Sequence, residues 1–438
     1  MAKVDTSPAR GTRDLLPADV SLRGSMTELI LKEYQKRGFN RIETPSIENL
    51  DRLIGSGGGD NEKLVFKILK RGEKLEESAK TSAELADLGL RFDLTVPLAR
   101  YYANNFARLP AVFRSIQIGP VWRAERPQKG RYRQFVQCDI DIIGEPSVVA
   151  ELELISTTLD AVSALGIDNL TLRYNDRRLL EVLMDSAEIS QKLRPSVLVS
   201  LDKVDKLGLD QVEAELGTIL GDPIKAKHLV DQMANLSDHG QPNIDGLISL
   251  GLSAGAIEDL MAIELLGERL DSTRFLFDPT VIRGMGYYTG PIFELGVPSL
   301  GFSIGGGGRY DEMMSRFGRP SPACGFSLGF ERLALYMEDK GRLSSTVAPV
   351  VHLRCASNSD YPLALSVVRR LAARGTLGLI EGSSRKLDSV LKGLRVAFNS
   401  NLDTRPEWEV LVELRGDQMS ISTIGGIVPN DFASMLHG

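Results

Sequence analysis

The chain has 438 residues, a hydrophobic content of 42%, a charged content of 25% and a formal net charge of −6 at pH 7. This length suffices for two or three domains with separate cores, and the composition is ordinary for a soluble globular protein. No apolar run reaches the ~20 residues that span a bilayer, and a nucleic-acid partner would have to meet a local basic surface because the whole chain is acidic.

The N-terminus and the cysteines favour a cytoplasmic protein. Residues 1–17, MAKVDTSPARGTRDLLP, lack the apolar core of a signal peptide. Cys138, Cys324 and Cys355 lie far apart in the sequence, which fits a reducing compartment. The four histidines are also scattered. We therefore expect no metal site built from cysteine or histidine.

The first part of the chain mixes helical and extended patterns. Residues 21–39 have the spacing of an amphipathic helix, and the strand-like RIETPSIE (41–48) follows. Residues 56–75 predict a glycine-rich loop that leads into a short β-hairpin. Residues 88–105, LGLRFDLTVPLARYYANN, predict a strand running into a helix, with Pro97 near the helix start.

A basic hairpin is predicted next. Five cationic residues lie within residues 123–133, and the alternating run 135–143 predicts a strand. Arginine can meet phosphate oxygens at two points. Arg123 and Arg131 could therefore converge on one anion while Phe135 offers an aromatic face, which would suit a nucleotide. The alternative is a solvated basic loop.

The rest of the chain alternates between helical and mixed regions. Residues 146–168 predict a long amphipathic helix, 169–176 a strand, and about 175–265 a helical insertion. Beyond it, FSIGGGGRYDEMM (302–314) predicts a glycine-rich turn that opens a helix. After the linker GRLSSTVAP, about 347–438 predict a small domain of alternating strands and helices.

Two further stretches favour anion binding over a merely solvated hairpin. Arg332 follows a glycine-broken strand in FSLGFERL, and Arg283 stands beside Gly284 and Gly286, with Tyr287 next. A P-loop motif and a dinucleotide-binding GxGxxG unit are both missing from the sequence. A nucleotide site would therefore belong to another fold.

Several motifs resemble those of the class II aminoacyl-tRNA synthetases. VWRAERPQKGRYRQF resembles their motif 2, GFSLGFERL motif 3 and GFNRIETPSIE motif 1. More narrowly, the chain resembles the histidyl-tRNA synthetases from residue 11 to about 340. The segments that match this family are GTRDLLP (11–17), RFDLTVP (91–97), RGMGYYTGPIFE (283–294) and GGGRYD (306–311).

The resemblance implies an α+β fold in which helices flank a six- or seven-stranded antiparallel sheet. It implies a homodimer formed through motif 1. The catalytic domain would comprise residues 1–172 and 266–340, interrupted by a helical insertion at 173–265. Residues 347–438 would form a small α/β domain like the family's anticodon-binding domain.

The resemblance also implies that the chain activates histidine with ATP and Mg²⁺ and transfers it to tRNA(His). In this family the histidine carboxylate attacks the α-phosphorus of a bent ATP, so that arginines from separate regions meet around one triphosphate. Mg²⁺ would come with ATP, without a metal site of the protein's own. The implied ATP contacts are Arg123 and Arg283 at the α-phosphate, Glu125 and Phe135 at the adenine, and Arg131 and Arg332 at the β- and γ-phosphates.

The histidine pocket and the tRNA contact follow from the same resemblance. Asp141 and Tyr288 would bracket the imidazole, while Asp93, Thr95 and Gln137 would hold the α-ammonium. Tyr287 is either a ligand or a packing residue. In a regular strand Gln137, Asp139 and Asp141 share one face, so Asp139 should lie near the pocket. Arg126 and Gln128 match the family's acceptor-stem contacts, and the alternative for them is a solvated loop tip.

The chain departs from the family in two places. Gly286 stands where the family usually has an acidic residue. The C-terminal region has the expected alternation but lacks the family's characteristic strand sequences, and its charges nearly balance. Two alternatives therefore stay open: a paralogue that activates histidine or a related amino acid without charging tRNA, and a regulatory histidine-binding subunit of histidine biosynthesis.

Overall fold

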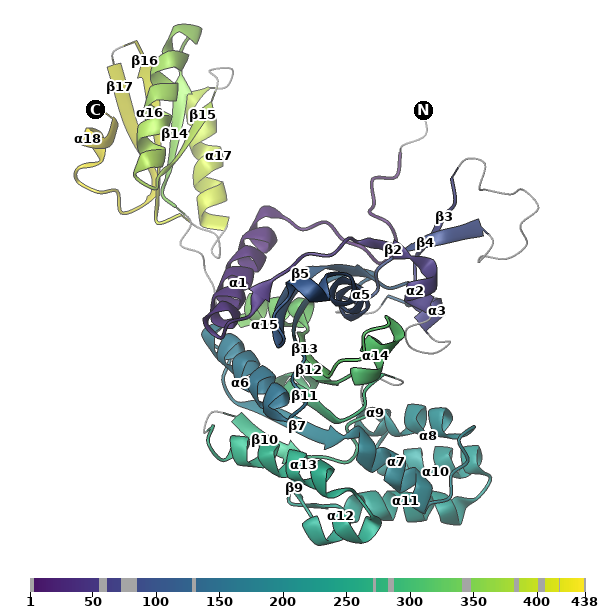
Figure 1. The fold of residues 1–438 in the computed structure, drawn as a ribbon. Coiled ribbons are helices and arrows are strands. Elements are labelled where there is room, and N and C mark those ends of the chain that lie inside the picture. Colours follow the sequence, from purple (N-terminus) through teal and green to yellow (C-terminus); the bar gives the residue numbers. More distant parts are fainter. Residues whose placement is uncertain are drawn as a thin grey trace. The chain divides into compact units, whose positions relative to one another are not determined.

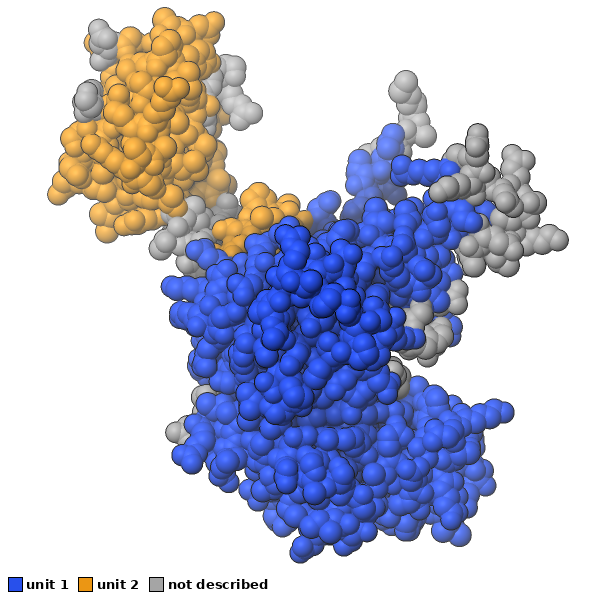
Figure 2. All heavy atoms as spheres, in the orientation of Figure 1, with its two compact units in different colours: residues 1–14, 26–336 blue, residues 15–25, 337–438 orange. Residues whose placement is uncertain are grey.

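The computed structural model describes residues 4–54, 61–71, 85–127, 131–270, 273–282, 287–340, 348–381, 386–400, 406–416 and 418–436. Its contacts divide the chain into two compact units (Figure 2). Unit 1 comprises residues 1–14 and 26–336, and unit 2 comprises residues 15–25 and 337–438. The domain boundaries within unit 1 stay a prediction.

Unit 1 is built around an eight-stranded sheet (Figure 1). The six central strands are antiparallel, whereas the two edge strands β1 and β10 run parallel to their neighbours. In spatial order the strands are β1 (Asn40–Arg41), β5 (Phe113–Trp122), β6 (Gln134–Ile143), β13 (Ala323–Leu328), β12 (Phe302–Arg309), β11 (Pro291–Val297), β7 (Leu170–Asp176) and β10 (Thr273–Phe277). The predicted antiparallel sheet is confirmed, with two parallel strands added at its edges.

A three-stranded antiparallel sheet and several helices accompany the large sheet. The small sheet contains β2 (Ile47–Asn49), β4 (Ala86–Leu90) and β3 (Lys67–Leu69). The helices are α1 (Pro17–Lys36), α2 (Leu50–Ile54), α3 (Asn61–Leu64), α5 (Thr95–Asn105), α6 (Val149–Ala164), α14 (Asp311–Arg316) and α15 (Phe330–Lys340). The predicted first helix begins four residues earlier than expected, at Pro17, where its fixed φ and missing N–H are tolerated.

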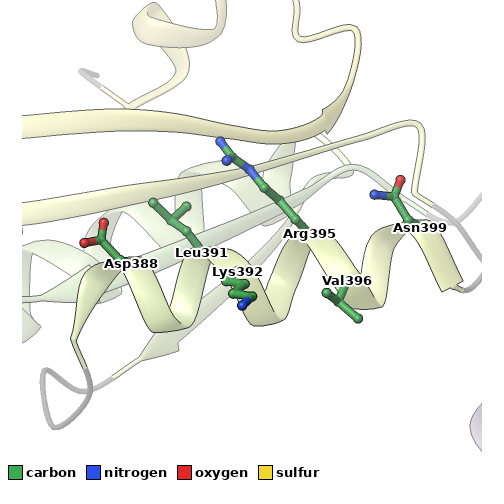
Figure 3. A pocket seen from close by; sticks show the side chains of 6 residues that line it. All are labelled: Asp388, Leu391, Lys392, Arg395, Val396 and Asn399. Atoms are coloured by element: carbon green, nitrogen blue, oxygen red, sulfur yellow. The ribbon is translucent and has the colours of Figure 1, made fainter.

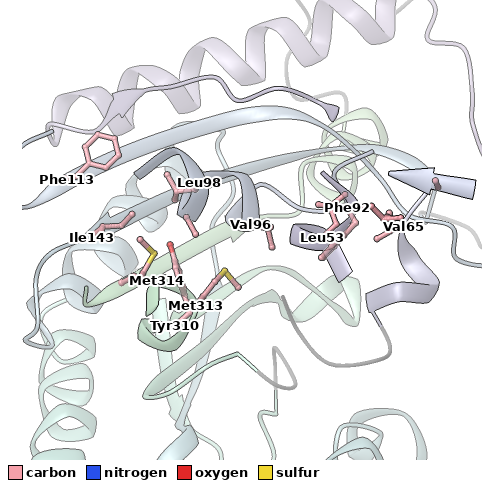
Figure 4. Close-up of a cluster of buried hydrophobic side chains, with 14 residues drawn as sticks. Leu53, Val65, Phe92, Val96, Leu98, Phe113, Ile143, Tyr310, Met313 and Met314 are labelled. Carbon is pink, nitrogen blue, oxygen red and sulfur yellow. The ribbon is translucent and has the colours of Figure 1, made fainter. Parts of the chain in front are cut away.

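A buried cluster joins α2, α5 and α14 to one end of the large sheet (Figure 4). Leu53, Val96 and Leu98 contribute apolar side chains from the helices, and Phe113 and Ile143 contribute from the sheet. The apolar area removed from water here is what holds the loop before α5 over the sheet. The cluster therefore fixes the position of Asp93, which lies in that loop.

The glycine run after residue 304 is a strand, so the prediction of a turn there is wrong. Gly305–Gly308 lie inside β12 and pair with β11 and β13. A Cβ at Gly307 would come 2.6 Å from Cε2 of Phe293, and one at Gly308 would come 3.1 Å from Cδ1 of Tyr288. Glycine is required here because neighbouring rings and backbone lie directly against the strand.

Residues 177–267 fold mainly as helices (Figure 1). The helices are α7 (Arg177–Ser186), α8 (Arg194–Leu201), α9 (Val204–Leu207), α10 (Leu209–Leu220), α11 (Pro223–Asn235), α12 (Ile244–Leu250) and α13 (Ala254–Gly267), and a short ladder joins β8 (Ser237–Asp238) to β9 (Gln241–Pro242). Asp176, Asp222, Asn243 and Ser253 cap four of them by accepting backbone N–H bonds. These caps explain why the helices start where the sequence breaks its apolar periodicity.

Unit 2 contains a four-stranded sheet of order β15-β14-β16-β17, in which only β17 is antiparallel to its neighbour. Its elements are β14 (Val350–Cys355), α16 (Tyr361–Ala373), β15 (Leu377–Glu381), α17 (Leu387–Ser400), β16 (Trp408–Arg415), β17 (Gln418–Gly426) and α18 (Phe432–Leu436). A pocket of about 540 Å³ lies along α17 between Asp388 and Asn399 (Figure 3). It contains none of the predicted catalytic residues.

None of the described helices is both long enough and apolar enough to cross a membrane.

Candidate active site

The basic hairpin and the motif around Arg332 lie at the same edge of the large sheet. Trp122 pairs with Gln134, Cys138 with Leu328, and Leu328 with Gly305. Because these strands are antiparallel, the end of β5, the start of β6, the end of β13 and the start of β12 meet at one edge. Arg123 follows β5 and Arg332 follows β13, so tertiary structure brings the two predicted phosphate contacts to that edge.

Arg123 and Phe135 form a charge-and-ring pair. The guanidinium carbon of Arg123 lies 5.0 Å from the ring centroid of Phe135, and Nε donates to the carbonyl of Phe92 at 3.0 Å. The backbone N–H of Arg123 also donates to the carbonyl of Arg133 at 2.8 Å. These contacts hold the side chain over the sheet edge, and no hydrogen bond within the described part of the chain uses its terminal nitrogens, which suit an anion.

The other predicted ATP contacts occupy the two arms of the hairpin and the start of α15. Glu125 is half-buried and its carbonyl accepts from Nε of Arg133 at 3.1 Å, while Arg131 is exposed. Nη1 of Arg332 donates to the carbonyl of Ser303 at 2.5 Å and to its Oγ at 3.2 Å. Arg126 is exposed. Gln128, Arg283 and Gly286 lie outside the described residues, so their predicted roles stay predictions.

Three buried carboxyl groups lie near one another, Asp93 in the loop before α5 and Asp139 and Asp141 within β6. Oδ1 of Asp93 accepts from the N–H of Val96 at 3.2 Å, and Oδ1 of Asp139 accepts from Ser327 Oγ at 2.5 Å. Asp141 Oδ1 accepts from the hydroxyl of Tyr310 at 2.6 Å. The negative charge of Asp141 contributes to raising the pKa of Asp139, so the two carboxyl groups are near one another, while the place of Asp139 at the histidine pocket stays a prediction.

The pKa of each of these carboxyl groups is raised, above all by burial. Burial raises the pKa of Asp93 to about 6 and that of Asp141 to about 7. The pKa of Asp139 is raised well above its ordinary value by burial and then by the negative charge of Asp141. A group of acids with raised pKa values inside a fold is suited to a cationic ligand, whose charge would stabilise the ionised carboxylates.

Gln137 is held in one orientation by this cluster. Its Nε2 donates to Asp139 Oδ2 and to Ser327 Oγ, each at 3.3 Å. Its Oε1 is buried and has no hydrogen-bond partner within the described part of the chain. Because Asp139 and Ser327 accept from the amide nitrogen, Oε1 of Gln137 is left for a donor on a ligand.

The two tyrosines before β11 border the same pocket. Their rings lie 4.6 Å apart, and both pack against the hydrophobic cluster of α2, α5 and α14. Loss of hydration raises the pKa of Tyr287, and the charges of Asp93 and Arg123 also affect it. Tyr287 therefore packs against the hydrophobic cluster and also lies near the carboxyl groups of Asp93 and Asp139. Thr95 is the first residue of α5 and is half-buried.

A glycine in β13 makes room for Asp141. A Cβ on Gly325 would overlap Oδ1 of Asp141 and would lie 3.2 Å from Cε1 of Tyr310. We expect Gly325→Ala to lower the free energy of unfolding by about 1–3 kcal/mol, because a buried carboxyl group would have to move. Chemical denaturation measures this.

The matched control is Gly255→Ala in α13, where an added Cβ meets open space. That change should raise stability by roughly 0.5–1 kcal/mol, since alanine is the better helix former. Equal stabilities for the Gly325 variant and the unmodified chain would contradict the close packing described here.

A comparison with known families is decisive at this point. The family model described as histidyl-tRNA synthetase matches residues 11–333. The chain belongs to the histidyl-tRNA synthetase family. The match includes the basic hairpin, the acid cluster, the glycine strand and Arg332, and it ends before most of unit 2.

Individual histidyl-tRNA synthetases extend the likeness beyond the family model. The chain is 47% identical over 411 residues to a histidine–tRNA ligase of Leifsonia xyli, which covers 90% of this chain and 92% of the relative. It is 34% identical to the enzyme of Christiangramia forsetii, with 90% of each chain covered. A match over 90% of the chain reaches into unit 2.

Solved structures share the fold. The histidyl-tRNA synthetase of Nostoc has a TM-score of 0.73 at 24% identity, with 99% of each chain covered. A Bacillus halodurans structure titled as an ATP phosphoribosyltransferase regulatory subunit/histidyl-tRNA synthetase has a TM-score of 0.71 at 20% identity and covers 89% of this chain and 97% of that one. At these identities the likeness concerns the fold alone.

Sequence reasoning missed two residues of the pocket. Tyr310 donates to Asp141, and Ser327 donates to Asp139. Tyr310 lies within GGGRYD, a segment that marks the histidyl-tRNA synthetase family, so a signal for it existed. Ser327 lies within GFSLGFERL, the segment that resembles motif 3, so a signal for it existed as well.

Proposed function

We propose that this protein is a histidine–tRNA ligase, which activates histidine with ATP and transfers it to tRNA(His). The single observation that supports this most is the acid cluster of Asp93, Asp139 and Asp141 beside the Arg123–Phe135 pair, in a member of the histidyl-tRNA synthetase family. The guanidinium of Arg123 can bind phosphate oxygens of a triphosphate. The carboxyl groups can bind the α-ammonium and the imidazole of an amino acid such as histidine.

In the first step a carboxylate oxygen of histidine attacks the α-phosphorus of ATP. The bond from that phosphorus to the bridging oxygen breaks, and pyrophosphate leaves. Arg123 and Arg283 would stabilise the charge on the α-phosphoryl group, and Arg131 and Arg332 that on the leaving pyrophosphate. Glu125 would accept from the adenine amino group and Phe135 would stack on the ring.

The same pocket would select histidine. Asp141 and Tyr288 would each bind one imidazole nitrogen, and Tyr287 would border the ring. Asp93, Thr95 and Gln137 would bind the α-ammonium, with the buried Oε1 of Gln137, unpartnered among the described residues, as an acceptor. An apolar analogue would leave these buried groups unpaired, which is a strong basis for rejection.

In the second step a ribose hydroxyl at the tRNA end attacks the carbonyl carbon of the adenylate, and AMP leaves. Arg126 and Gln128 would contact the acceptor stem, and residues 347–438 the anticodon region. We propose residues 1–172 and 266–340 as the catalytic domain and residues 173–265 as its insertion.

Mg²⁺ is proposed to arrive with ATP. The side chains assigned to the phosphates are arginines, which bind phosphate oxygens and cannot ligate a cation, so phosphate oxygens and water would hold the ion. Its contribution when bound would be to neutralise phosphate charge. We also propose a cytoplasmic homodimer formed through residues 38–48, which include the edge strand β1.

The test is histidine-dependent exchange of pyrophosphate into ATP, followed by charging of bulk tRNA. Both activities are expected. Exchange without charging would favour a paralogue that delivers histidine elsewhere. Failure of both would favour a regulatory histidine-binding subunit.

The raised pKa values predict how histidine binding depends on pH. A carboxyl group with a raised pKa is ionised only at higher pH, so Asp93 (pKa about 6) and Asp141 (pKa about 7) lose their charge as pH falls from 8 to 6. Because the ammonium needs the Asp93 anion and the imidazole N–H needs the Asp141 anion as its acceptor, the KM for histidine should be about tenfold higher at pH 6 than at pH 8. Exchange measured across this range checks it, with the KM for ATP as an internal control. A KM for histidine that falls toward pH 6 would contradict the assignment.

A further inference from the structure

The GTRDLLP motif has no role in the function proposed above, yet its first residues contact the ATP-binding hairpin. We propose that residues 10–13, the N-terminal strap, are a positioning element that holds the two arms of this hairpin and the start of α15 in register for ATP. The inference rests on the proposed function, since it concerns the ATP site of that reaction.

The strap is bonded to the returning arm of the hairpin. The N–H of Arg133 donates to the carbonyl of Gly11 at 2.7 Å, and its Nη1 donates to the carbonyl of Arg10 at 3.4 Å. Arg133 in turn donates from Nε to the carbonyl of Glu125 and accepts from the N–H of Arg123. A single residue, Arg133, therefore links the strap to two of the predicted ATP contacts.

Gly11 allows this close approach. Its φ is +85°, and an added Cβ would lie 2.8 Å from Cγ and Cδ of Arg133 and 2.8 Å from Cγ of Pro127. Pro127 and Arg133 belong to opposite arms of the hairpin. Any side chain at residue 11 would thus push against both arms, in addition to straining the backbone.

Arg13 connects the hairpin to α15. Its Nη2 donates to Oε2 of Glu331 at 2.8 Å, and its guanidinium carbon lies 4.3 Å from the ring centroid of Tyr132. The other oxygen of Glu331 accepts from the N–H of Val136 at 3.2 Å. The Glu331 side chain is only 8% exposed, so this bridge is better protected from solvent than an ordinary surface ion pair.

The consequence is that every described residue predicted to contact the phosphates is tied to the strap through a neighbour. Tyr132 and Glu331 are directly next to Arg131 and Arg332 in sequence, and Arg133 is bonded to the backbone of Arg123. The strap touches none of the three acids of the histidine pocket in any hydrogen bond of the described residues. Loss of the strap should therefore weaken ATP binding selectively.

The experiment compares the KM values for ATP and histidine in pyrophosphate exchange, and measures ATP binding by calorimetry without histidine. Arg13→Ala should raise the KM for ATP about tenfold, since a part-buried charged hydrogen bond is lost, and leave the KM for histidine within about twofold. Glu331→Gln should have a similar effect, and the double variant should be little worse than either, because both changes break one bridge.

Two matched controls separate positioning from general stability. Arg114→Ala removes another Arg–Glu pair, with Glu153 at 2.6 Å, from the opposite end of β5 and should change neither KM. Gly11→Ala should also raise the KM for ATP. Its control is Gly251→Ala, which imposes similar backbone strain at a φ of +95° where a Cβ meets open space and should leave the KM for ATP unchanged. A normal KM for ATP in Arg13→Ala, or equal rises in both KM values, would overturn the inference. If the unmodified protein lacks exchange, the proposed function fails, and ATP calorimetry still tests the strap.

Discussion

Replacing Asp141 with asparagine should raise the KM for histidine by about 10²–10³-fold, because a pocket built to bind both imidazole nitrogens would lose its anionic acceptor. Asp141 is buried, and within the described part of the chain Tyr310 is the one residue that donates a hydrogen bond to its side chain. The KM for ATP should stay near its normal value, because Arg123 and Phe135 are unchanged. Pyrophosphate exchange at varied histidine concentrations measures both constants.

Tyr310→Phe provides the graded comparison for this prediction. It keeps the ring and the Asp141 carboxylate but removes the hydroxyl that donates to it at 2.6 Å. Tyr310→Phe should raise the KM for histidine about tenfold, since one hydrogen bond to a charged group is lost. Should Asp141→Asn retain the normal KM for histidine, the imidazole would have to bind elsewhere.

Replacing Arg123 with alanine should reduce the turnover of pyrophosphate exchange by about 10²–10³-fold, because a preorganised charge at the α-phosphate is lost from the transition state. Arg123→Lys should recover only part of this, since lysine keeps the charge but cannot meet two oxygens with a planar fork. The measurement is exchange at saturating ATP and histidine.

The thermal stability of these Arg123 variants controls for damage to the fold. Arg123 also donates to the carbonyl of Phe92 and lies over Phe135, so some loss of stability is expected in both variants. Full turnover in the alanine variant would remove Arg123 from the reaction and with it the proposed assignment of the hairpin.

Much of the site could be predicted from local sequence. The arginines of the hairpin, the alternation of residues 135–143 and the glycines around Arg332 are local signals, and each lies on the expected strand, loop or helix. Arg283 was predicted from local sequence and Gln128 from the family resemblance, and both lie outside the described residues, as does Gly286. Local chemistry identifies such groups because a planar guanidinium is the side chain that meets phosphate oxygens at two points.

The glycine run of residues 305–308 shows where local reasoning fails. Taken alone, four glycines predict a turn, since glycine tolerates many backbone conformations. In the fold they form the middle of β12, because Phe293, Tyr288 and the backbone of β13 occupy the space where side chains would stand. The need for glycine here comes from neighbours that are distant in sequence. The local conformational propensity of glycine does not include such neighbours.

The amino-acid sequence is thus sufficient to identify the family, the antiparallel sheet and most of the residues assigned to ATP and histidine. The pairing of Tyr310 with Asp141, the clamp of Ser327 and Asp139 on Gln137, and the bridge from Arg13 to Glu331 required the folded chain. Those contacts join residues up to 318 positions apart. They depend on strand register and on burial, which are properties of the assembled sheet and cannot be read from any single segment.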